Sequence, residues 1–288
     1  MNDVVWTHRP ALRRPVLVAA FGGWNDAADA ASAAVEFIRA RFEPTEVARI
    51  ELEDYLDFTE TRPTARLVDS HTREIDWPET TISAAEIRGA DNDLVIVQGP
   101  EPSLRWRGYC DAILGVAREL DVDQVITLGS LLADVPHSRP VHVTGIGSDT
   151  ALLDRLGFSP TSYEGPTGIT GVLNYHCGQA GLSSISLWAS VPHYEAAAPN
   201  PKVALALVRA FEGAAGLAVD ASELEEAAED YERQVSAAVA SDPEVRAFVE
   251  RLESAMDEVA DDTDAEANLP SADMIARDFQ KFLRQRRS

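Results

Sequence analysis

Several residue types and patterns are scarce in this chain of 288 residues, and each scarcity excludes a class of protein. Its two cysteines, Cys110 and Cys177, lie far apart in helix-like apolar surroundings, so we expect buried thiols rather than disulfides or a metal cluster. No apolar run approaches the roughly eighteen residues of a membrane-spanning helix. The first fifteen residues hold no apolar run of signal-peptide length. The sequence therefore predicts a cytoplasmic protein.

Positive charge is also scarce. The chain has 25 lysines and arginines against 48 acidic residues, which gives a net charge of −23. Only Lys202 and Lys281 are lysines. Nucleic acids and anionic membrane surfaces repel such a polyanion. We therefore expect protein or small-molecule partners, and neither nucleic acid nor membrane.

The motifs that bind common cofactors are missing as well. Gly22-Gly23 lacks the third glycine of a dinucleotide fingerprint, and no glycine-rich loop ends in Gly-Lys-Ser or Gly-Lys-Thr. Ser130 lacks the flanking glycines of a nucleophile elbow. No close pair of histidines or cysteines has the spacing of metal ligands. The sequence predicts no cofactor and no bound metal.

What the chain does contain is an alternation of strand-like and helix-like segments. Short apolar runs predict strands, and amphipathic segments between them predict helices. The expected strands are 16–21, 47–52, 94–97, 124–128, 141–146 and 184–191, with a hairpin within 66–77 and helices at 27–42, 104–120 and 149–156. Such alternation predicts an α/β fold, with a mostly parallel sheet and helices on both faces.

The composition changes after Ala218, which suggests an α/β core domain at 1–218 and an acidic helical region at 219–288. From Ala221 onward the chain has eighteen acidic and eight basic residues. Residues 222–260 read as helix with a break at Asp242-Pro243, and Ser222 with Glu225 predicts a capping box. An acidic linker at 261–268 and a last helix from Leu269 complete this reading. We expect the helices to pack on the core or on a partner.

Polar residues follow several of the predicted strands. In an open parallel sheet, ligands bind beyond the carboxyl ends of the strands, so these loops are expected to converge on a pocket. A glycine-rich turn that opens a helix, here near Gly168, exposes backbone amides that bind anions. The alternative is that these residues are turn residues, helix caps and surface polar groups, and Asp26 in particular fits a helix cap. The candidates are Asn25, Asp26, Glu101, His137, Glu164, Gly165, Thr167, Gly168 and His193.

Longer segments carry a resemblance to a known family. They are Phe21-Gly22-Gly23-Trp24-Asn25-Asp26-Ala27, Gly99-Pro100-Glu101-Pro102, Gly165-Pro166-Thr167-Gly168-Ile169, Leu187-Trp188-Ala189-Ser190-Val191-Pro192-His193-Tyr194, Pro199-Asn200-Pro201 and Leu269-Pro270-Ser271-Ala272-Asp273. Together they resemble the proteasome assembly chaperone 2 family, in particular its bacterial branch in actinobacteria. The resemblance implies a three-layer α/β fold similar to nucleoside phosphorylases and related hydrolases. It also implies a tendency to form homo-oligomers, possible trimers among them.

For the best-understood relatives the resemblance implies a non-enzymatic role in assembling proteasome rings, whereas bacterial members are largely of unassigned function. Assembly chaperones of this kind can dock through a C-terminal motif of a hydrophobic residue, tyrosine and any residue. The printed sequence ends in Arg286-Arg287-Ser288. We therefore expect contact with a partner, such as proteasome subunits, through another surface, for example the apolar face of the last helices.

Two functional hypotheses follow. The first is a non-enzymatic oligomeric protein-binding or assembly factor. The alternative is a phosphorylase-like or hydrolase-like enzyme. In that enzyme Glu164 would orient the substrate, His137 or His193 would act as acid or base, and backbone amides at Gly165 and Gly168 would hold an anion.

Overall fold

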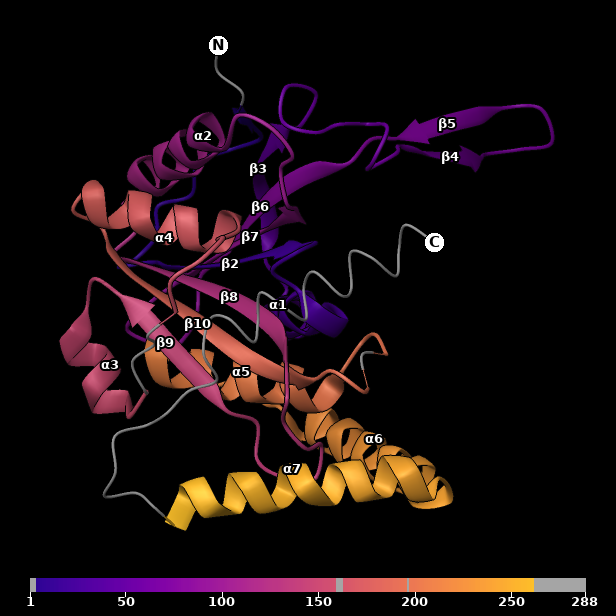
Figure 1. Ribbon diagram of the computed structural model, residues 1–288. Helices are drawn as coiled ribbons and strands as arrows, with labels where there is room; N and C mark the ends of the chain where they lie inside the picture. Colours follow the sequence, from indigo (N-terminus) through magenta and orange to yellow (C-terminus); the bar gives the residue numbers. More distant parts are fainter. Residues whose placement is uncertain (1–3, 159–162, 196, 262–288) are drawn as a thin grey trace.

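The computed structural model describes residues 4–158, 163–195 and 197–261, and an eight-stranded sheet runs through its centre (Figure 1). Four adjacent strands are parallel to one another, and antiparallel strands flank them on both sides. The strand order is β1(Val4–Trp6), β3(Thr45–Glu51), β6(Glu79–Ala85), β7(Leu94–Pro100), β2(Val16–Gly22), β8(Gln124–Ala133), β10(Ser183–Pro192) and β9(Val143–Gly147). The four parallel strands at the centre are β7, β2, β8 and β10.

Helices cover both faces of this sheet (Figure 1). The central strands are nearly continuous apolar runs because both of their faces are buried. Alternate residues of β2 point to opposite faces, so Val18 belongs to one hydrophobic cluster and Phe21 to the other. The first cluster lies under α1(Ala30–Phe42), α3(Thr150–Leu156) and α5(Pro201–Ala215), and the second under α2(Trp106–Glu119) and α4(Ile169–Gln179). The predicted three-layer α/β fold is confirmed. Its sheet is parallel only at the centre and mixed as a whole.

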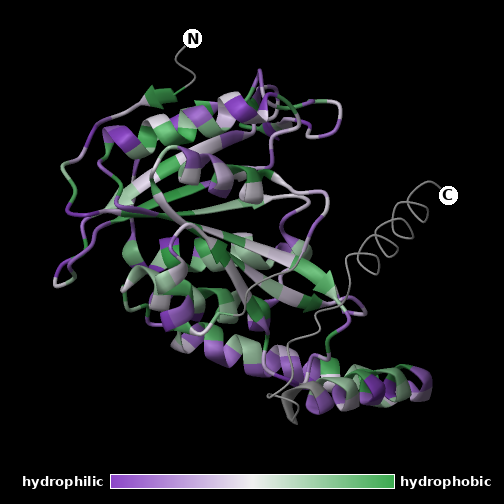
Figure 2. Ribbon diagram, turned by 60° about the vertical axis from the view of Figure 1, so that its left-hand side comes forward, coloured by the Kyte–Doolittle hydropathy of each residue, from purple (hydrophilic) through white to green (hydrophobic). Residues whose placement is uncertain are grey.

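Two further helices, α6(Ser222–Ser241) and α7(Pro243–Asp261), follow the α/β body. α6 packs on α5, and Leu224 joins the first hydrophobic cluster. α7 packs back on α6, where Val235 and Val249 are buried in a small third cluster. Figure 2 shows many hydrophilic residues along this helical pair, whereas the central strands are mainly hydrophobic. The apolar face of α6 is therefore used within the same chain.

The predicted capping box at the start of α6 is wrong. The first helical residue is Ser222 itself, so Ala221 occupies the cap position and no side chain caps the helix there. The Ser222 hydroxyl instead donates a hydrogen bond to Asp220 at 2.6 Å. The cap position thus lies one residue earlier than the pattern indicated, and the Ser222 hydroxyl is occupied by the carboxylate that precedes it.

The remaining elements follow the sequence pattern with three omissions. The hairpin expected within 66–77 exists as β4(Thr64–Leu67) and β5(Arg73–Asp76), but it forms a separate two-stranded sheet. The edge strand β1, the flanking strand β6 and the helix α5 had no counterpart in the prediction. None of the described helices is long and apolar enough to cross a membrane. The predicted linker and last helix beyond Asp261 lie outside the described residues, and the proposed division into two domains stays a prediction.

Candidate functional site

The nine candidate residues do not form one pocket. Asn25, Asp26, Glu101 and Gly168 meet at the carboxyl ends of the central strands, and we call these four the strand-end cluster. His137 and His193 lie instead where the body meets α6 and α7. Glu164, Gly165 and Thr167 are exposed in the turn before α4. Among the described residues, no hydrogen bond or ion pair joins Glu164 to either histidine.

Glu101 holds the strand-end cluster together. One carboxylate oxygen, Oε1, accepts hydrogen bonds from the side-chain amide of Asn25 at 2.6 Å and from the backbone N–H of Ile169 at 2.8 Å. The other oxygen accepts a longer bond from the backbone N–H of Trp24 at 3.3 Å. The start of α4, where an external anion was expected to bind, thus already faces a carboxylate of the same chain. A phosphate placed there would meet the negative charge of Glu101.

Gly168 is required by the packing around Asn25. A Cβ atom at position 168 would come within 2.1 Å of the Asn25 Oδ1 atom, well inside van der Waals contact. Asn25 is fully buried, and its Oδ1 atom has no hydrogen-bond partner among the described residues. The glycine of this turn therefore allows the close approach of two loops, a structural role that explains its place in the sequence.

Asp26 acts as the helix cap that the sequence suggested. Its Oδ1 atom accepts hydrogen bonds from the backbone N–H groups of Ala31 at 2.7 Å and of Ser32 at 3.2 Å, in the first turn of α1. A short 3₁₀ turn, Ala27–Asp29, separates the cap from the helix. Burial raises the pKa of the Asp26 carboxyl, and the hydrogen bonds from Ser32 and Ala31 partly offset this effect. Its lone pairs are already in use, which leaves it poorly placed as a free catalytic base.

His137 links the body to α6. Its Nδ1 atom lies 2.7 Å from the hydroxyl oxygen of Tyr194, which also accepts the backbone N–H of His137 at 2.7 Å. Its Nε2 atom lies 3.0 Å from the hydroxyl of Ser236 on α6. The tyrosine hydroxyl is free to donate to Nδ1, which assigns the proton of the neutral ring to Nε2 and makes Ser236 the acceptor. Burial, followed by the positive charge of Lys202, lowers the pKa of His137.

His193 belongs to the same junction. Its Nδ1 atom lies 2.8 Å from a carboxylate oxygen of Asp134, and its ring packs edge-to-face against Phe248 of α7 with the ring centroids 5.6 Å apart. Lys202 adds an ion pair to Glu232 of α6 at 2.5 Å and donates to the backbone carbonyl of His137. His137 is thus buried between the body and α6, whereas the His193 side chain is 41% exposed and contacts α7 through the Phe248 ring.

Residues 20–239 match the family model of the PAC2 family. The chain belongs to the PAC2 family. The resemblance read from the sequence is thereby confirmed. The matched range contains all nine candidate residues and nearly all of α6, and it ends before α7.

Solved structures of PAC2 family proteins are similar to this chain over most of its length. One from Streptomyces avermitilis shares 44% identity and a TM-score of 0.76, and the match covers 82% of this chain and 99% of that one. A proteasome-assembly chaperone homologue from Mycobacterium tuberculosis also shares 44% identity at a TM-score of 0.76, over 81% of this chain and 99% of that one. An archaeal proteasome activator from Pyrococcus furiosus shares the fold, with 16% identity and a TM-score of 0.65. That match covers 83% of this chain and 99% of the other. No curated protein matches the chain.

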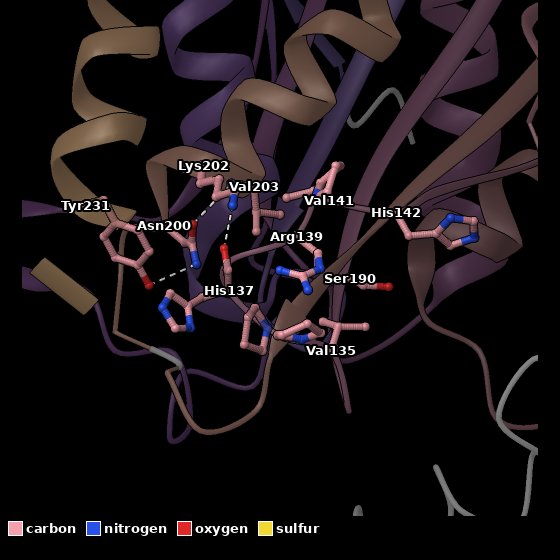
Figure 3. A pocket seen from close by; sticks show the side chains of 13 residues that line it. Val135, His137, Arg139, Val141, His142, Ser190, Asn200, Lys202, Val203 and Tyr231 are labelled. Atoms are coloured by element: carbon pink, nitrogen blue, oxygen red, sulfur yellow. Dashed lines mark hydrogen bonds between the residues drawn. The ribbon is translucent and has the colours of Figure 1, made fainter. Parts of the chain in front are cut away.

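A small pocket lies beside His137 in this PAC2 family protein (Figure 3). Its cavity volume of about 10 Å³ is close to the lower limit for one water molecule. Asn200 on its wall donates to the Tyr231 hydroxyl at 3.0 Å and accepts the backbone N–H of Val203 at 3.1 Å (Figure 3). This pocket has no room for a nucleoside, and Asn200, Tyr231 and Lys202 on its wall already form hydrogen bonds with other residues of the wall.

Sequence reasoning missed the residues that join α6 to the body of this PAC2 family chain. They are Tyr194, Asn200, Lys202, Tyr231 and Ser236. Part of the signal was present, since the Pro199-Asn200-Pro201 segment contributed to the family resemblance. Both cysteines are buried free thiols, as predicted, and burial raises the pKa of each to about 12. Among the described residues, no group of three histidine, cysteine or acidic side chains is placed to hold a metal ion.

Proposed function

We propose that this chain is a non-enzymatic, homo-oligomeric protein-binding factor that assists the assembly of a larger protein complex, with proteasome subunits as the partner to test first. Membership of the PAC2 family carries the proposal, together with 44% identity to a proteasome-assembly chaperone homologue. The geometry supports it, because Asp26 and Glu101 use their hydrogen-bonding capacity inside the fold. No feature of the described residues favours the phosphorylase-like or hydrolase-like alternative.

The outer face of α6 is the surface we propose for the partner. α6 carries six acidic residues and one basic residue. Its buried positions, such as Leu224 and Val235, face the body and α7, so the exposed acidic side chains, among them Glu226 and Glu229, point to solvent. Such a face attracts a partner with a basic surface and speeds their encounter.

A charge-reversal variant tests this proposal better than a truncation. Deletion of everything after Ala218 would uncover the apolar surface of α5 that Leu224 covers, so loss of binding would only report unfolding. The variant Glu226→Lys with Glu229→Lys changes exposed residues of α6 that form no ion pair among the described residues. The control, Asp111→Lys with Asp154→Lys, makes the same change of charge on exposed positions of α2 and α3.

The experiment mixes the intact protein with actinobacterial proteasome α- and β-subunits and follows ring assembly by native gel and size-exclusion chromatography. We expect the wild type and the control to bind the subunits or to increase the assembled fraction, and the α6 variant to bind at least about tenfold more weakly, which corresponds to about 1.4 kcal/mol. Equal binding by all three would remove α6 from the proposal. No binding by the wild type would remove proteasome subunits as the partner.

A further inference from the structure

Two loops lie side by side next to the strand-end cluster, and we call residues 51–60 and 101–105 together the strand-end surface. The first loop follows β3 and the second follows β7. The backbone N–H groups of Ser103 and Leu104 both donate to the carbonyl of Tyr55, at 2.8 and 2.9 Å. These hydrogen bonds fix the two loops against each other.

The strand-end surface carries unbalanced negative charge. Residues 51–60 hold five acidic residues and no basic one, and all five are exposed. Asp54 forms an ion pair with Arg105 at 2.7 Å. Among the described residues, the other four acidic side chains of this loop form no ion pair; they are Glu51, Glu53, Asp57 and Glu60. A surface of this kind attracts a positively charged ligand.

Apolar side chains are exposed at the same place. Leu104 on the strand-end surface is 52% exposed. On adjacent loops Trp24, whose backbone N–H binds Glu101, is 44% exposed, and Tyr163 before α4 is 38% exposed. An apolar patch with a charged rim marks an interaction site. The ligand that fits this surface therefore combines apolar side chains with positive charge.

The chain contains such a segment beyond the described residues. The sequence of 269–288 predicts a helix with Ile275, Phe279 and Phe282 along one side. Residues 281–288 hold four basic residues and no acidic one, namely Lys281, Arg284, Arg286 and Arg287. In charge and in hydropathy this segment is complementary to the strand-end surface.

The length of the chain allows the segment to reach that surface. The seven residues 262–268 can span about 23 Å when extended, and a helix of twenty residues adds about 30 Å. A folded body of this size has a radius of gyration of only about 18 Å. Because the segment is covalently attached, its effective concentration at the surface is on the order of millimolar. This attachment favours the segment over a free basic ligand.

We propose that residues 269–288 dock on the strand-end surface of the same copy of the chain. Phe279 and Phe282 contact the apolar patch around Leu104, and the basic side chains lie beside the acidic loop 51–60. The inference goes beyond the proposed function, which places the partner on α6, and it needs no second molecule. The docked segment keeps other basic ligands away from the strand ends.

Carbodiimide cross-linking of the intact protein tests which carboxylates lie beside the segment. The reagent joins a lysine amine to a neighbouring carboxylate through an amide bond, and Lys202 and Lys281 are the only lysines of the chain. Lys202 forms an ion pair with Glu232, so the link between these two residues is the internal positive control. We expect Lys281 to be linked to acidic residues of 51–60, as identified by mass spectrometry of the digested protein.

Two outcomes of this experiment would overturn the proposal. One is a Lys281 that is linked only to acidic residues outside 51–60. The other is a Lys281 without any link although the control link of Lys202 has formed. A mixture of unlabelled and isotope-labelled protein adds a third criterion. We expect links between peptides of the same label, whereas links between unlabelled and labelled peptides would place the segment on another copy.

Two matched variants test the apolar part of the contact. Phe282→Ser should lower the yield of the Lys281 link at least about fivefold, because the ring no longer contributes its burial. Gln280→Ser changes a residue on the opposite side of the predicted helix and should leave the yield unchanged. Equal yields in the wild type and both variants would contradict docking through this face. No proteasome subunit is present, so failure here is distinct from failure of the assembly test.

Discussion

Asp26 illustrates how one side chain can be read correctly from the sequence alone. A carboxylate just after a buried strand and just before an alanine-rich helix fits a cap, and Asp26 indeed accepts the first-turn N–H groups of α1. Glu101 has no comparable local signal. Its partners, Asn25 and Ile169, are 76 and 68 residues away in the sequence, so only the folded sheet brings them together.

The cap at Asp26 yields a prediction. Asp26→Ala removes the acceptor for Ala31 and Ser32 and should destabilise the protein by about 0.5–2 kcal/mol. Asp26→Asn keeps an acceptor oxygen and removes a carboxyl group whose pKa is raised by burial. This variant should therefore lose clearly less stability than Asp26→Ala. Urea unfolding of the three proteins measures both differences. Equal losses in the two variants would show that the negative charge itself, rather than the acceptor, stabilises the start of α1.

At the scale of the element, the sequence was most informative about strands buried on both faces. β2 and the first half of β7 are unbroken apolar runs and were found without difficulty, because no polar residue interrupts them. β6 was missed because it mixes polar and apolar residues in its interior. Thr80 and Ser83 are both buried there, and the Thr80 hydroxyl shares a hydrogen bond of 2.6 Å with the hydroxyl of Tyr109. Polar residues satisfied by tertiary contacts hide a strand from pattern analysis.

The candidate site was predicted only in part for a related reason. The loops that carry Asn25, Asp26 and Glu101 converge because the parallel strands β2 and β7 end on the same side of the sheet, and Gly168 at the start of α4 packs against Asn25. The same rule placed His137 and His193 beside them. Their true neighbours are Ser236 and Phe248, which come from helices much later in the chain. A rule for sheets has no information about where such appended helices dock.

The docking of α6 is expected to depend on pH through His137. This side chain is neutral in the folded protein, with a pKa lowered mainly by burial and then by Lys202, while Glu232, Glu253 and Glu195 act in the opposite direction. Because the folded-state pKa lies below the ordinary value of 6.5, the contribution of His137 to docking is fully present above pH 6.5 and is lost as the pH falls from 6.5 through the lower folded-state pKa.

Hydrogen exchange of the backbone amides of α6 measures this effect at about pH 7.5 and about pH 5.5, on either side of the ordinary histidine pKa, after correction for the intrinsic exchange rates. We expect lower protection at the lower pH in the wild type. His137→Gln cannot titrate in this range and should show a smaller change between the two conditions. Protection that rises at the lower pH in the wild type alone would contradict the assigned neutral ring.

The whole molecule carries far more negative than positive charge, and this excess sets its response to salt. A net charge of −23 opposes compaction through self-repulsion, although many individual ion pairs are present on the surface. Exposed ion pairs contribute little each, about 0–1 kcal/mol at the median. The unpaired excess of acidic residues should therefore dominate the salt dependence of stability.

We expect the thermal unfolding temperature to rise as NaCl is increased from about 0.01 M to 0.1 M, where the screening length falls from about 30 Å to about 10 Å. Differential scanning calorimetry at one low protein concentration measures this shift with little contribution from self-association. KCl at equal concentration should give the same increase, which identifies screening rather than a bound ion. A fall in the unfolding temperature would instead show that the ion pairs outweigh the repulsion.

The hydrogen bonds of Glu101 also bear on the order in which parts of the protein fold. Its hydrogen bonds unite the loop after β2, the end of β7 and the start of α4, so they require three distant segments to be in place beforehand. Contacts of such long sequence separation carry a high entropic cost of loop closure and form after local structure. We therefore expect the strand-end cluster to assemble only after β2, β7 and α4 are in place. At the amino ends of the same strands, Asp93 before β7 binds Arg13 before β2, a residue 80 positions away in the sequence, through a backbone hydrogen bond and an ion pair at 2.6 Å. A carboxylate therefore joins neighbouring segments at each end of the parallel strands.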